Sequence, residues 1–399
     1  MNITENRKLK YTCLFGGGGA RGFAYGGALQ AIEDLGIEIS MTGGSSVGAI
    51  VASLVSVGYN SSELKDIFMK ANFELFRDIR FGLGKDFSLS KGEVFTEWLR
   101  GLLRAKLWGD DSKYRNKNVT FKDIKLPLVV ITTNLSNFKC QEFSQAVTPD
   151  YDVAQAVRIS CSMPGLMAPM DYNGTSLVDG DLQKSMPMWK LSDTINKSAD
   201  RVLELRLEGD YSGKERNVLD YLNTIYSCMM SVGTELVSNL YRKNDKYECV
   251  KINTRGTIIV DFNMSKEARK DLFALGYDEV NNYFKSFLPL KKRFLLEKYK
   301  SLFILAKDLD IYVKSSQVQK AKGKLGDLFI ELADCRDNID ERIYAECLDV
   351  KNRFKESVVQ GLLGDKFLNK DKLNIVLGGL TARLTVKIKE LEAFVQNSK

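Results

Sequence analysis

A short glycine–serine segment constrains this chain more than any other feature of its sequence. Gly44-Ser45-Ser46-Val47-Gly48 has the spacing G-x-S-x-G, and it joins a predicted strand at 37–43 to an apolar helix predicted at 49–58. The two glycines leave room for a sharp turn that lifts the Ser46 hydroxyl out of the sheet. The free amides at the start of the helix would point at the same place. Ser46 is therefore a candidate nucleophile, and the alternative is a strand–helix turn whose small residues serve packing.

The base that would serve Ser46 cannot be a histidine, because the 399 residues include none. A carboxylate is the natural substitute, and the best-placed one is Asp179 in Leu177-Val178-Asp179-Gly180-Asp181, which follows a predicted hairpin turn at 171–175. A carboxyl group ordinarily titrates at about 4, so burial beside Ser46 would have to raise the pKa of Asp179. The alternative is an ordinary Asp-Gly turn at the end of a strand.

A glycine-rich loop precedes both segments. A predicted strand at 9–15 runs into Gly16-Gly17-Gly18-Gly19-Ala20-Arg21-Gly22, and a helix is predicted over 23–35. Consecutive glycines after a strand allow several backbone amides to face one point, as an anion site requires. We expect the amides near Gly18, Gly19 and Ala20 to form an oxyanion hole for a carbonyl attacked by Ser46. Arg21 could orient the loop, meet a substrate phosphate, or be a surface charge.

Residues 17–22 also satisfy G-x-G-x-x-G, so a dinucleotide site is an alternative. Glu38 follows at about the distance expected of a ribose-binding acid. The predicted strand continues past Glu38 and ends in the serine turn, however, whereas the second strand of a dinucleotide-binding unit should end on that acid. The oxyanion-hole interpretation is therefore preferred.

Taken together, these segments resemble the patatin-like phospholipase family, in its bacterial form with an additional C-terminal helical domain. The resemblance spans about residues 8–285 and rests on the segments 17–22, 44–48, 156–165 and 179–180. It implies a three-layer α/β/α fold with a mainly parallel sheet, and hydrolysis of lipid acyl esters by a serine–aspartate dyad without metal or cofactor. The implied site comprises Ser46 and Asp179 as nucleophile and base, Gly17, Gly18, Gly19 and Ala20 as the oxyanion hole, and Arg21, Gly22, Gly44, Gly48 and Gly180 as supporting motif positions.

One position departs from the family pattern. The third segment usually reads Asp-Gly-Gly or Asp-Gly-Ala, whereas Asp181 occupies the last place here. If Asp181 faces the dyad, its charge would raise the pKa of Asp179 further, and if it faces outward nothing follows.

The order of predicted elements is consistent with an α/β fold. Strands are expected at 9–15, 37–43, 127–133, 176–179 and 201–207, and helices at 23–35, 47–58, 61–71, 92–104 and 150–158. Such alternation predicts a parallel sheet with helices on both faces. From Pro289 onward strand signals vanish and helical periodicity takes over, so we expect a helical domain over 290–399.

Charge within this helical domain is uneven. Residues 290–324 contain ten Lys or Arg and three Asp or Glu, and ten minus three gives +7, the net charge of the whole chain. A basic amphipathic helix can lie on an anionic membrane surface. A solvated helix face packed on the α/β domain is an alternative of at least equal weight. Nucleic-acid binding is not expected, because no recognised module is present.

Composition favours a globular protein in a reducing compartment. Apolar residues make up 44% of the chain and charged residues 27%. Residues 1–7 lack the apolar core of a signal peptide, and no apolar run approaches the ~20 residues of a membrane span. The seven cysteines are scattered without C-x-x-C pairs. We therefore expect a cytoplasmic protein that reaches the membrane surface transiently.

The sequence thus predicts a lipid acyl hydrolase of phospholipase A or lysophospholipase type that acts on membrane glycerophospholipids. Because a free phospholipase endangers the membrane of its own cell, we expect a latent state released by an activating ligand or protein through the helical domain. The alternatives are a catalytically idle lipid-binding or scaffold protein of the same fold, and a nucleotide-binding protein using 17–22. Head group, acyl chain, sn-position, oligomeric state, target membrane and the role of Asp181 are not predicted.

Overall fold

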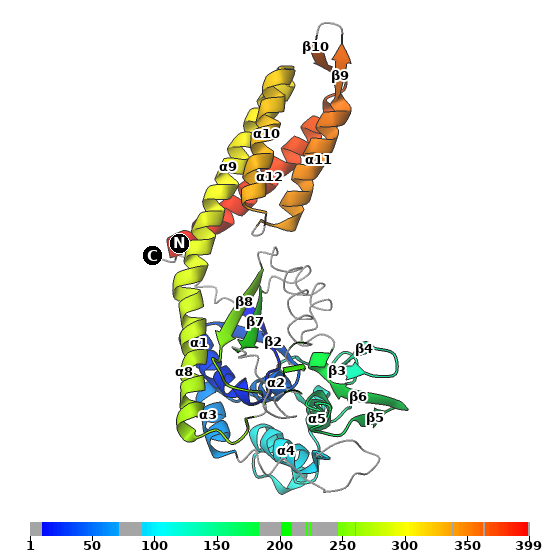
Figure 1. Cartoon of the computed structure of the whole chain (residues 1–399), viewed down its shortest axis with the longest axis vertical. Coiled ribbons are helices and arrows are strands. Elements are labelled where there is room, and N and C mark those ends of the chain that lie inside the picture. The colour runs from blue at the N-terminus through cyan, green and yellow to red at the C-terminus, as the bar shows by residue number, and fades with distance from the viewer. Residues whose placement is uncertain are drawn as a thin grey trace. The chain divides into compact units, whose positions relative to one another are not determined.

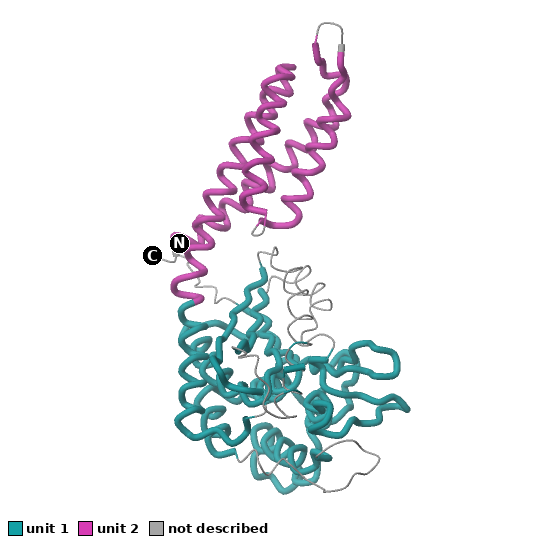
Figure 2. Tube along the Cα trace, in the orientation of Figure 1, with its two compact units in different colours: residues 1–240, 246–282 teal, residues 241–245, 283–399 magenta. Residues whose placement is uncertain are grey.

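The chain divides into two compact units in its computed structural model (Figure 2). Unit 1 comprises residues 1–240 and 246–282, and unit 2 comprises residues 241–245 and 283–399. The structure describes the chain from residue 10 to residue 397 except 72–89, 183–200, 210–245 apart from four isolated positions, 260, 337–338 and 362–363.

The described residues of unit 1 form a mixed sheet of eight strands (Figure 1). The strands are β1 (Lys10–Phe15), β2 (Glu38–Gly44), β3 (Leu128–Asn134), β4 (Lys139–Ser144), β5 (Met170–Tyr172), β6 (Thr175–Asp179), β7 (Arg201–Glu208) and β8 (Tyr247–Asn253). Their order is β5-β6-β3-β2-β1-β7-β8, with β4 also paired to β3. The run from β3 through β2, β1 and β7 to β8 is parallel, and β4, β5 and β6 pair antiparallel. This largely parallel sheet with its helices confirms the predicted α/β fold class.

Five of the helices described in unit 1 lie close to predicted positions, and a sixth was not predicted. They are α1 (Phe23–Asp34), α2 (Val47–Ser56), α3 (Ser61–Lys70), α4 (Glu93–Trp108), α5 (Val153–Ser160) and α8 (Lys266–Asn282), with short 3-10 turns at η1 (Gly19–Gly22) and η5 (Gly180–Leu182) among others. The helix predicted at 150–158 begins later, because the Asp152 side chain caps it by accepting from the Ala154 amide at 3.0 Å. Strands β4, β5 and β8 and helix α8 were absent from the sequence prediction.

The edge of β3 determines where two predicted motifs meet. β4 pairs with β3 along Val129–Asn134, so β2 and β6 must share the opposite edge. β2 runs parallel to β3 and ends with Gly44 opposite Val130. β6 runs antiparallel to β3 and ends with Asp179 opposite Thr132. The carboxyl ends of β2 and β6 therefore face each other across the position of Ile131.

In the described part of unit 2, four helices share an apolar core. They are α9 (Leu288–Lys314), α10 (Val318–Asp334), α11 (Glu341–Ser357) and α12 (Asp371–Asn397). Buried residues in α9 recur at spacings of four and three: Leu295, Tyr299, Leu302, Ala306, Leu309 and Val313. This repeat places one stripe of each helix in the core, as in coiled-coil packing.

The predicted absence of strands beyond Pro289 is wrong in one place. A short antiparallel hairpin, β9 (Val358–Gly361) and β10 (Gly364–Phe367), joins α11 to α12. Phe367 packs edge-on against Phe354 of α11, with ring centroids 5.6 Å apart. Strands of four residues carry too few alternations to be visible as a period-2 pattern within a helical sequence.

The basic stretch 290–324 has acidic partners within unit 2. Ion pairs involve at least five of its ten Lys and Arg side chains: Lys298 with Glu331, Lys300 with Glu392, Lys314 with Asp310, Lys322 with Asp365, and Lys324 with Asp327. Its expected apolar face is the core stripe of α9. These contacts within unit 2 favour a solvated helix face over a surface kept for an anionic membrane, and the predicted packing of that helix on the α/β domain stays a prediction.

Candidate active site

Ser46 occupies a sharp turn between β2 and α2. Its backbone has φ 51° and ψ −129°, a conformation that residues other than glycine rarely adopt. The Ser46 amide donates to the Ser160 hydroxyl at 2.9 Å, and that hydroxyl donates to the Ile131 carbonyl at 2.6 Å. Ser160 on α5 thus links the turn to the middle of β3. Sequence reasoning missed this role, although Ser160 lies in the segment 156–165 that it singled out.

The motif glycines are required by close approach of the backbone. A Cβ on Gly44 would lie 2.4 Å from the carbonyl carbon of Gly48, and one on Gly48 would lie 2.0 Å from the carbonyl oxygen of Phe15. The same limit holds at two supporting positions, where a Cβ on Gly22 would meet Val47 at 2.1 Å and one on Gly180 would meet the Ile131 carbonyl at 2.3 Å. The turn is therefore compact enough to present Ser46 only if these positions carry no side chain.

Asp179 is fully buried at the end of β6. Its amide donates to the Ser162 carbonyl at 3.1 Å, and its Oδ1 accepts from the Asp181 amide at 2.9 Å. The neighbouring Gly180 lies against the serine turn, since its Cβ would come within 3.1 Å of the Ser45 side chain. The structure thus brings the Asp179 segment and the turn carrying Ser46 together.

The Ser46 hydroxyl forms no hydrogen bond to another residue in the described part of the chain, and the residue is 5% exposed. Hydrogen bonds between a nucleophile and its base are often long before substrate binds and tighten in the complex. The Oγ is also not used to cap α2. The hydroxyl therefore remains available for chemistry.

The glycine-rich loop presents fewer amides than expected. The Ala20 amide donates to the Ile259 carbonyl at 2.7 Å, so it is occupied, which differs from the sequence expectation. The Gly17 amide lies beside the Asp181 carboxyl group. Gly18 and Gly19 have φ 148° and 55°, and their amides have no acceptor among the described residues. They are the loop amides that a substrate oxygen can use.

Arg21 anchors the glycine-rich loop to the segment that contains Thr257. Its side chain is buried, and Nε donates to the Thr257 carbonyl at 2.7 Å. Of the three expectations for Arg21, the structure agrees with loop orientation, and the surface-charge alternative is wrong. Tyr25 braces the other side, because its hydroxyl lies 2.7 Å from the Gly16 carbonyl.

Asp181 faces inward, which decides between the two alternatives that the sequence left. It is 2% exposed, and its Oδ1 is hydrogen-bonded to the Ser45 hydroxyl. Burial raises the pKa of Asp181 well above its ordinary value, and the adjacent Asp179 raises it further. Burial and both aspartates raise the pKa of the Cys161 thiol.

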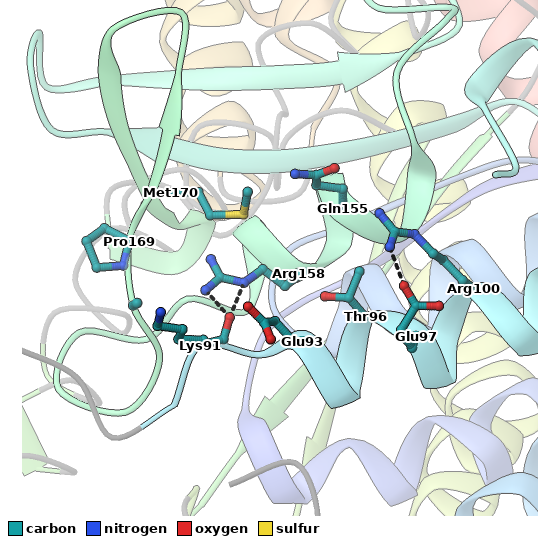
Figure 3. A pocket seen from close by; sticks show the side chains of 10 residues that line it. Lys91, Glu93, Thr96, Glu97, Arg100, Gln155, Arg158, Pro169 and Met170 are labelled. Carbon is teal, nitrogen blue, oxygen red and sulfur yellow. Dashed lines mark hydrogen bonds and ion pairs between the residues drawn. The ribbon is translucent and has the colours of Figure 1, made fainter. Parts of the chain in front are cut away.

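A cavity of about 600 Å³ lies beside α4, α5 and the start of β5 (Figure 3). Arg158 on its wall is 4% exposed and donates through Nε and Nη2 to the Lys91 carbonyl, at 3.1 and 2.5 Å. Nη1 donates to the Ser162 hydroxyl at 3.1 Å. Burial lowers the pKa of Arg158 to about 10, so the group stays charged at neutral pH. The Ser162 carbonyl accepts from the Asp179 amide. Through Ser162, Arg158 therefore braces the segment that positions Asp179.

One family model and several known proteins match parts of this chain. The family model for patatin-like phospholipases matches residues 14–190. Uncharacterized protein R571 of Acanthamoeba polyphaga mimivirus is 28% identical over 277 residues, which cover 66% of this chain and 90% of that protein. The lysophospholipase NTE1 of Yarrowia lipolytica is 27% identical over 175 residues, which cover 44% of this chain and 11% of that protein.

The fold has a counterpart among solved structures. VipD from Legionella pneumophila matches with a TM-score of 0.55 at 16% identity, over 96% of this chain and 90% of that chain. This likeness concerns the fold alone. No helix in the described residues has the length and apolar character needed to span a membrane.

Proposed function

The chain belongs, through residues 14–190, to the patatin-like phospholipase family, and from this premise we propose that it hydrolyses fatty-acyl esters of membrane glycerophospholipids or lysophospholipids. The observation that carries the proposal is the meeting of two strand ends on β3. β2 leads into Ser46 opposite Val130, and β6 ends in buried Asp179 opposite Thr132. A strained serine beside a buried carboxylate is the arrangement that a serine–aspartate dyad needs.

In the first step the Ser46 oxygen attacks the ester carbonyl carbon while its proton passes to Asp179. The carbonyl oxygen becomes negatively charged and accepts hydrogen bonds from the amides of Gly18 and Gly19. Loss of one such donor typically costs about 3–4 kcal/mol of transition-state stabilisation. The intermediate then collapses, the bond to the alcohol oxygen breaks, and Asp179 returns the proton to the leaving alcohol.

In the second step water attacks the acyl group held on Ser46. Asp179 takes a proton from the water, the same amides stabilise the oxyanion, and the proton returns to the Ser46 oxygen as the fatty acid leaves. The carboxylate therefore serves as base in both halves of the reaction. Every step uses groups of this chain, so the proposed reaction needs no metal ion.

The family match and the name of one relative support the proposed substrate class. The printed name of the Yarrowia lipolytica relative is lysophospholipase, and the aligned 175 residues cover 44% of this chain. We extend this to a glycerophospholipid or lysophospholipid ester at a membrane surface. The proposed setting is the cytoplasm, with transient contact with that surface.

The test is fatty-acid release from mixed phospholipid liposomes in the presence of EDTA. Ser46→Ala and Asp179→Asn should each abolish release, because one removes the nucleophile and the other the base. Ser56→Ala is the matched control, since it makes the same change in α2 where the hydroxyl donates to the Ser53 carbonyl at 2.7 Å. Substantial release by Ser46→Ala, or release that EDTA abolishes, would overturn the proposed mechanism.

A catalytically idle lipid-binding protein is the second candidate. The motivation is that the Ser46 hydroxyl forms no hydrogen bond within the described residues. Labelling with a fluorophosphonate separates the two, since only an activated serine reacts. Labelling of the wild type but not of Ser46→Ala supports the enzyme, and no labelling under any condition supports the idle protein.

Regulation through unit 2 is part of the proposal. A second compact unit joined to a lytic site motivates a latent state that an activating ligand or protein relieves through residues 283–399. Purified protein should then hydrolyse liposomes slowly and respond to a cell extract. Full activity of the purified protein, with no gain from any extract, would remove this part of the proposal.

A further inference from the structure

Asp181 has no part in the proposed reaction, yet it contacts all three segments of the site. It lies in the η5 turn, two residues after Asp179, and its amide donates to Asp179 Oδ1 at 2.9 Å. Its own Oδ1 is hydrogen-bonded to the hydroxyl of Ser45, which immediately precedes the proposed nucleophile. A single buried carboxyl group thus connects the base segment with the serine turn.

The third contact is with the glycine-rich loop. A Cβ built on Gly17 would lie 1.3 Å from Asp181 Oδ2 and 2.8 Å from Oδ1, so the carboxyl group occupies the space that a side chain at 17 would need. Gly17 directly precedes the Gly18 and Gly19 amides proposed for the oxyanion hole. The position of Asp181 therefore bears on both the nucleophile turn and the oxyanion loop.

The groups around Asp181 disfavour its charged form. Asp179 lies on β6, Tyr25 on α1 and Cys161 at the end of α5, and each is an acid whose ionisation would add negative charge. No Lys or Arg among the described residues forms an ion pair with Asp181. The Ser45 hydroxyl and the Gly17 amide favour the charged form, but burial and Asp179 outweigh them and hold the pKa of Asp181 well above its ordinary value.

We propose that Asp181 is a positioning residue that keeps its proton while the enzyme works and, as a neutral acid, ties the glycine-rich loop to the serine turn. Two buried carboxyl groups this close cannot both ionise at low cost, so one of them keeps its proton. When Asp181 is the protonated group, Asp179 is the charged base. Loss of the Asp181 proton at higher pH would place a second negative charge beside Asp179 and the oxyanion loop. This inference rests on the proposed function only for its effect on catalysis.

The protonation claim has a signature in stability. Asp181 holds its proton in the folded chain and releases it above about pH 4 in the unfolded chain. The pKa of Asp181 is higher in the folded chain than in the unfolded chain. Protonated Asp181 therefore contributes fully to stability below its pKa in the unfolded chain, and this contribution is lost as pH rises towards its pKa in the folded chain. Relative to Asp181→Asn, the unfolding equilibrium constant of the wild type should rise by up to about tenfold per pH unit in that window.

Urea unfolding of the full chain between about pH 4.5 and pH 7.5 measures this ratio. All three tryptophans (98, 108 and 189) lie in unit 1, so their fluorescence follows the unit that holds Asp181. Asp271→Asn on the exposed face of α8 is the matched control, and its ratio to wild type should stay flat. Asp181→Gly, which carries the residue usual in the family, removes the same proton and should show the same pH trend. It replaces Asp181→Asn in the series if that variant folds poorly.

Activity supplies the second readout. Asp181→Asn and Asp181→Gly are expected to lower liposome hydrolysis at neutral pH, because the contacts to Ser45 and Gly17 change. The activity that remains should persist to a pH at least about one unit above the alkaline fall of the wild type. Tyr25 and Cys161 are intact in these variants, so they cannot cause the difference.

The outcomes are distinct. A rising unfolding ratio with a shifted alkaline limb supports the inference. A flat ratio like that of Asp271→Asn overturns it, and so does an unshifted alkaline limb in an active variant. If the wild type hydrolyses no lipid at any pH, the proposed function fails, and the unfolding series alone still decides whether Asp181 keeps its proton.

Discussion

The site in unit 1 and the helical bundle of unit 2 place their charges in opposite ways. In unit 1, Asp179, Asp181 and Arg158 are buried, and each is held by backbone groups or hydroxyls. In unit 2 the described core is a run of apolar side chains, and pairs such as Lys314–Asp310 lie at the surface. The first arrangement costs stability and makes chemistry possible, whereas the second stabilises a shape.

This difference shows how strictly each region specifies its residues. At the site one added carbon atom is enough to disturb the structure, since the Phe15 carbonyl excludes any side chain at Gly48. In the bundle a class of residue suffices, because positions such as Leu302, Leu309 and Leu380 need only be apolar and of about the right volume. Unit 1 should therefore respond to small substitutions mainly through activity, and unit 2 mainly through stability.

The largest effect is expected from Gly48→Ala. Its Cβ would lie 2.0 Å from the Phe15 carbonyl oxygen, so the serine turn must move away from β1. A displacement of about 1 Å at a reacting group can cost about 100-fold in rate. Liposome hydrolysis should fall by at least that factor, and fluorophosphonate labelling of Ser46 should slow in parallel. Wild-type labelling would show that the turn tolerates a side chain.

In the bundle, Leu380→Ala should act on stability. Leu380 is fully buried in the core of α12, and a buried Leu→Ala change typically costs about 2–5 kcal/mol. Hydrogen exchange of α12 amides reports the local opening free energy. Ile375→Ala on the same helix is the matched control, because Ile375 is 74% exposed and should change exchange little. Equal effects at the two positions would mean that α12 does not use this face for packing.

The same contrast explains what the sequence could predict. The serine turn, the glycine loop and most elements of unit 1 were predicted, because their signals are local: glycine spacing, apolar runs and turn residues. The link from Ser46 to Ser160 joins residues 114 positions apart, and the meeting of β2 and β6 depends on strand register. Neither can be read from local pattern. The roles of Ser46 and Asp179 in catalysis remain predictions.

Occupied groups were a second limit of sequence reasoning. The Ala20 amide was expected in the oxyanion hole, but Ile259, far along the chain, takes it. The inward position of Asp181 likewise depends on the space that Gly17 leaves. In unit 2 the basic stretch 290–324 was interpreted as a possible membrane surface, because most of the acids that pair with it lie outside the stretch. Local charge counts omit such partners.

Two double-mutant cycles compare the coupling free energy of one polar contact in each region. Ser45→Ala with Asp181→Ala should give a coupling of about 1–2 kcal/mol in unfolding free energy, because their hydrogen bond is buried. Lys314→Ala with Asp310→Ala should give about 0.3–0.5 kcal/mol, since Lys314 of this i,i+4 pair is solvent-exposed. Urea unfolding followed by fluorescence serves the first cycle and hydrogen exchange the second. Similar couplings would contradict the proposed contrast between the two regions.

The smallest effect is expected from Gly378→Ala, and its sign is opposite to that of Gly48→Ala. Gly378 lies exposed within α12, and a Cβ there would have no atom within 4 Å outside its own helix. Alanine limits the unfolded chain and favours the helix, so the bundle should gain about 0.5–1 kcal/mol. Slower hydrogen exchange in α12, with unchanged liposome hydrolysis, is the expected result. Faster exchange would mean that other atoms cover this face of α12. An added side chain would then be crowded in both regions, and the contrast with the serine turn would be lost.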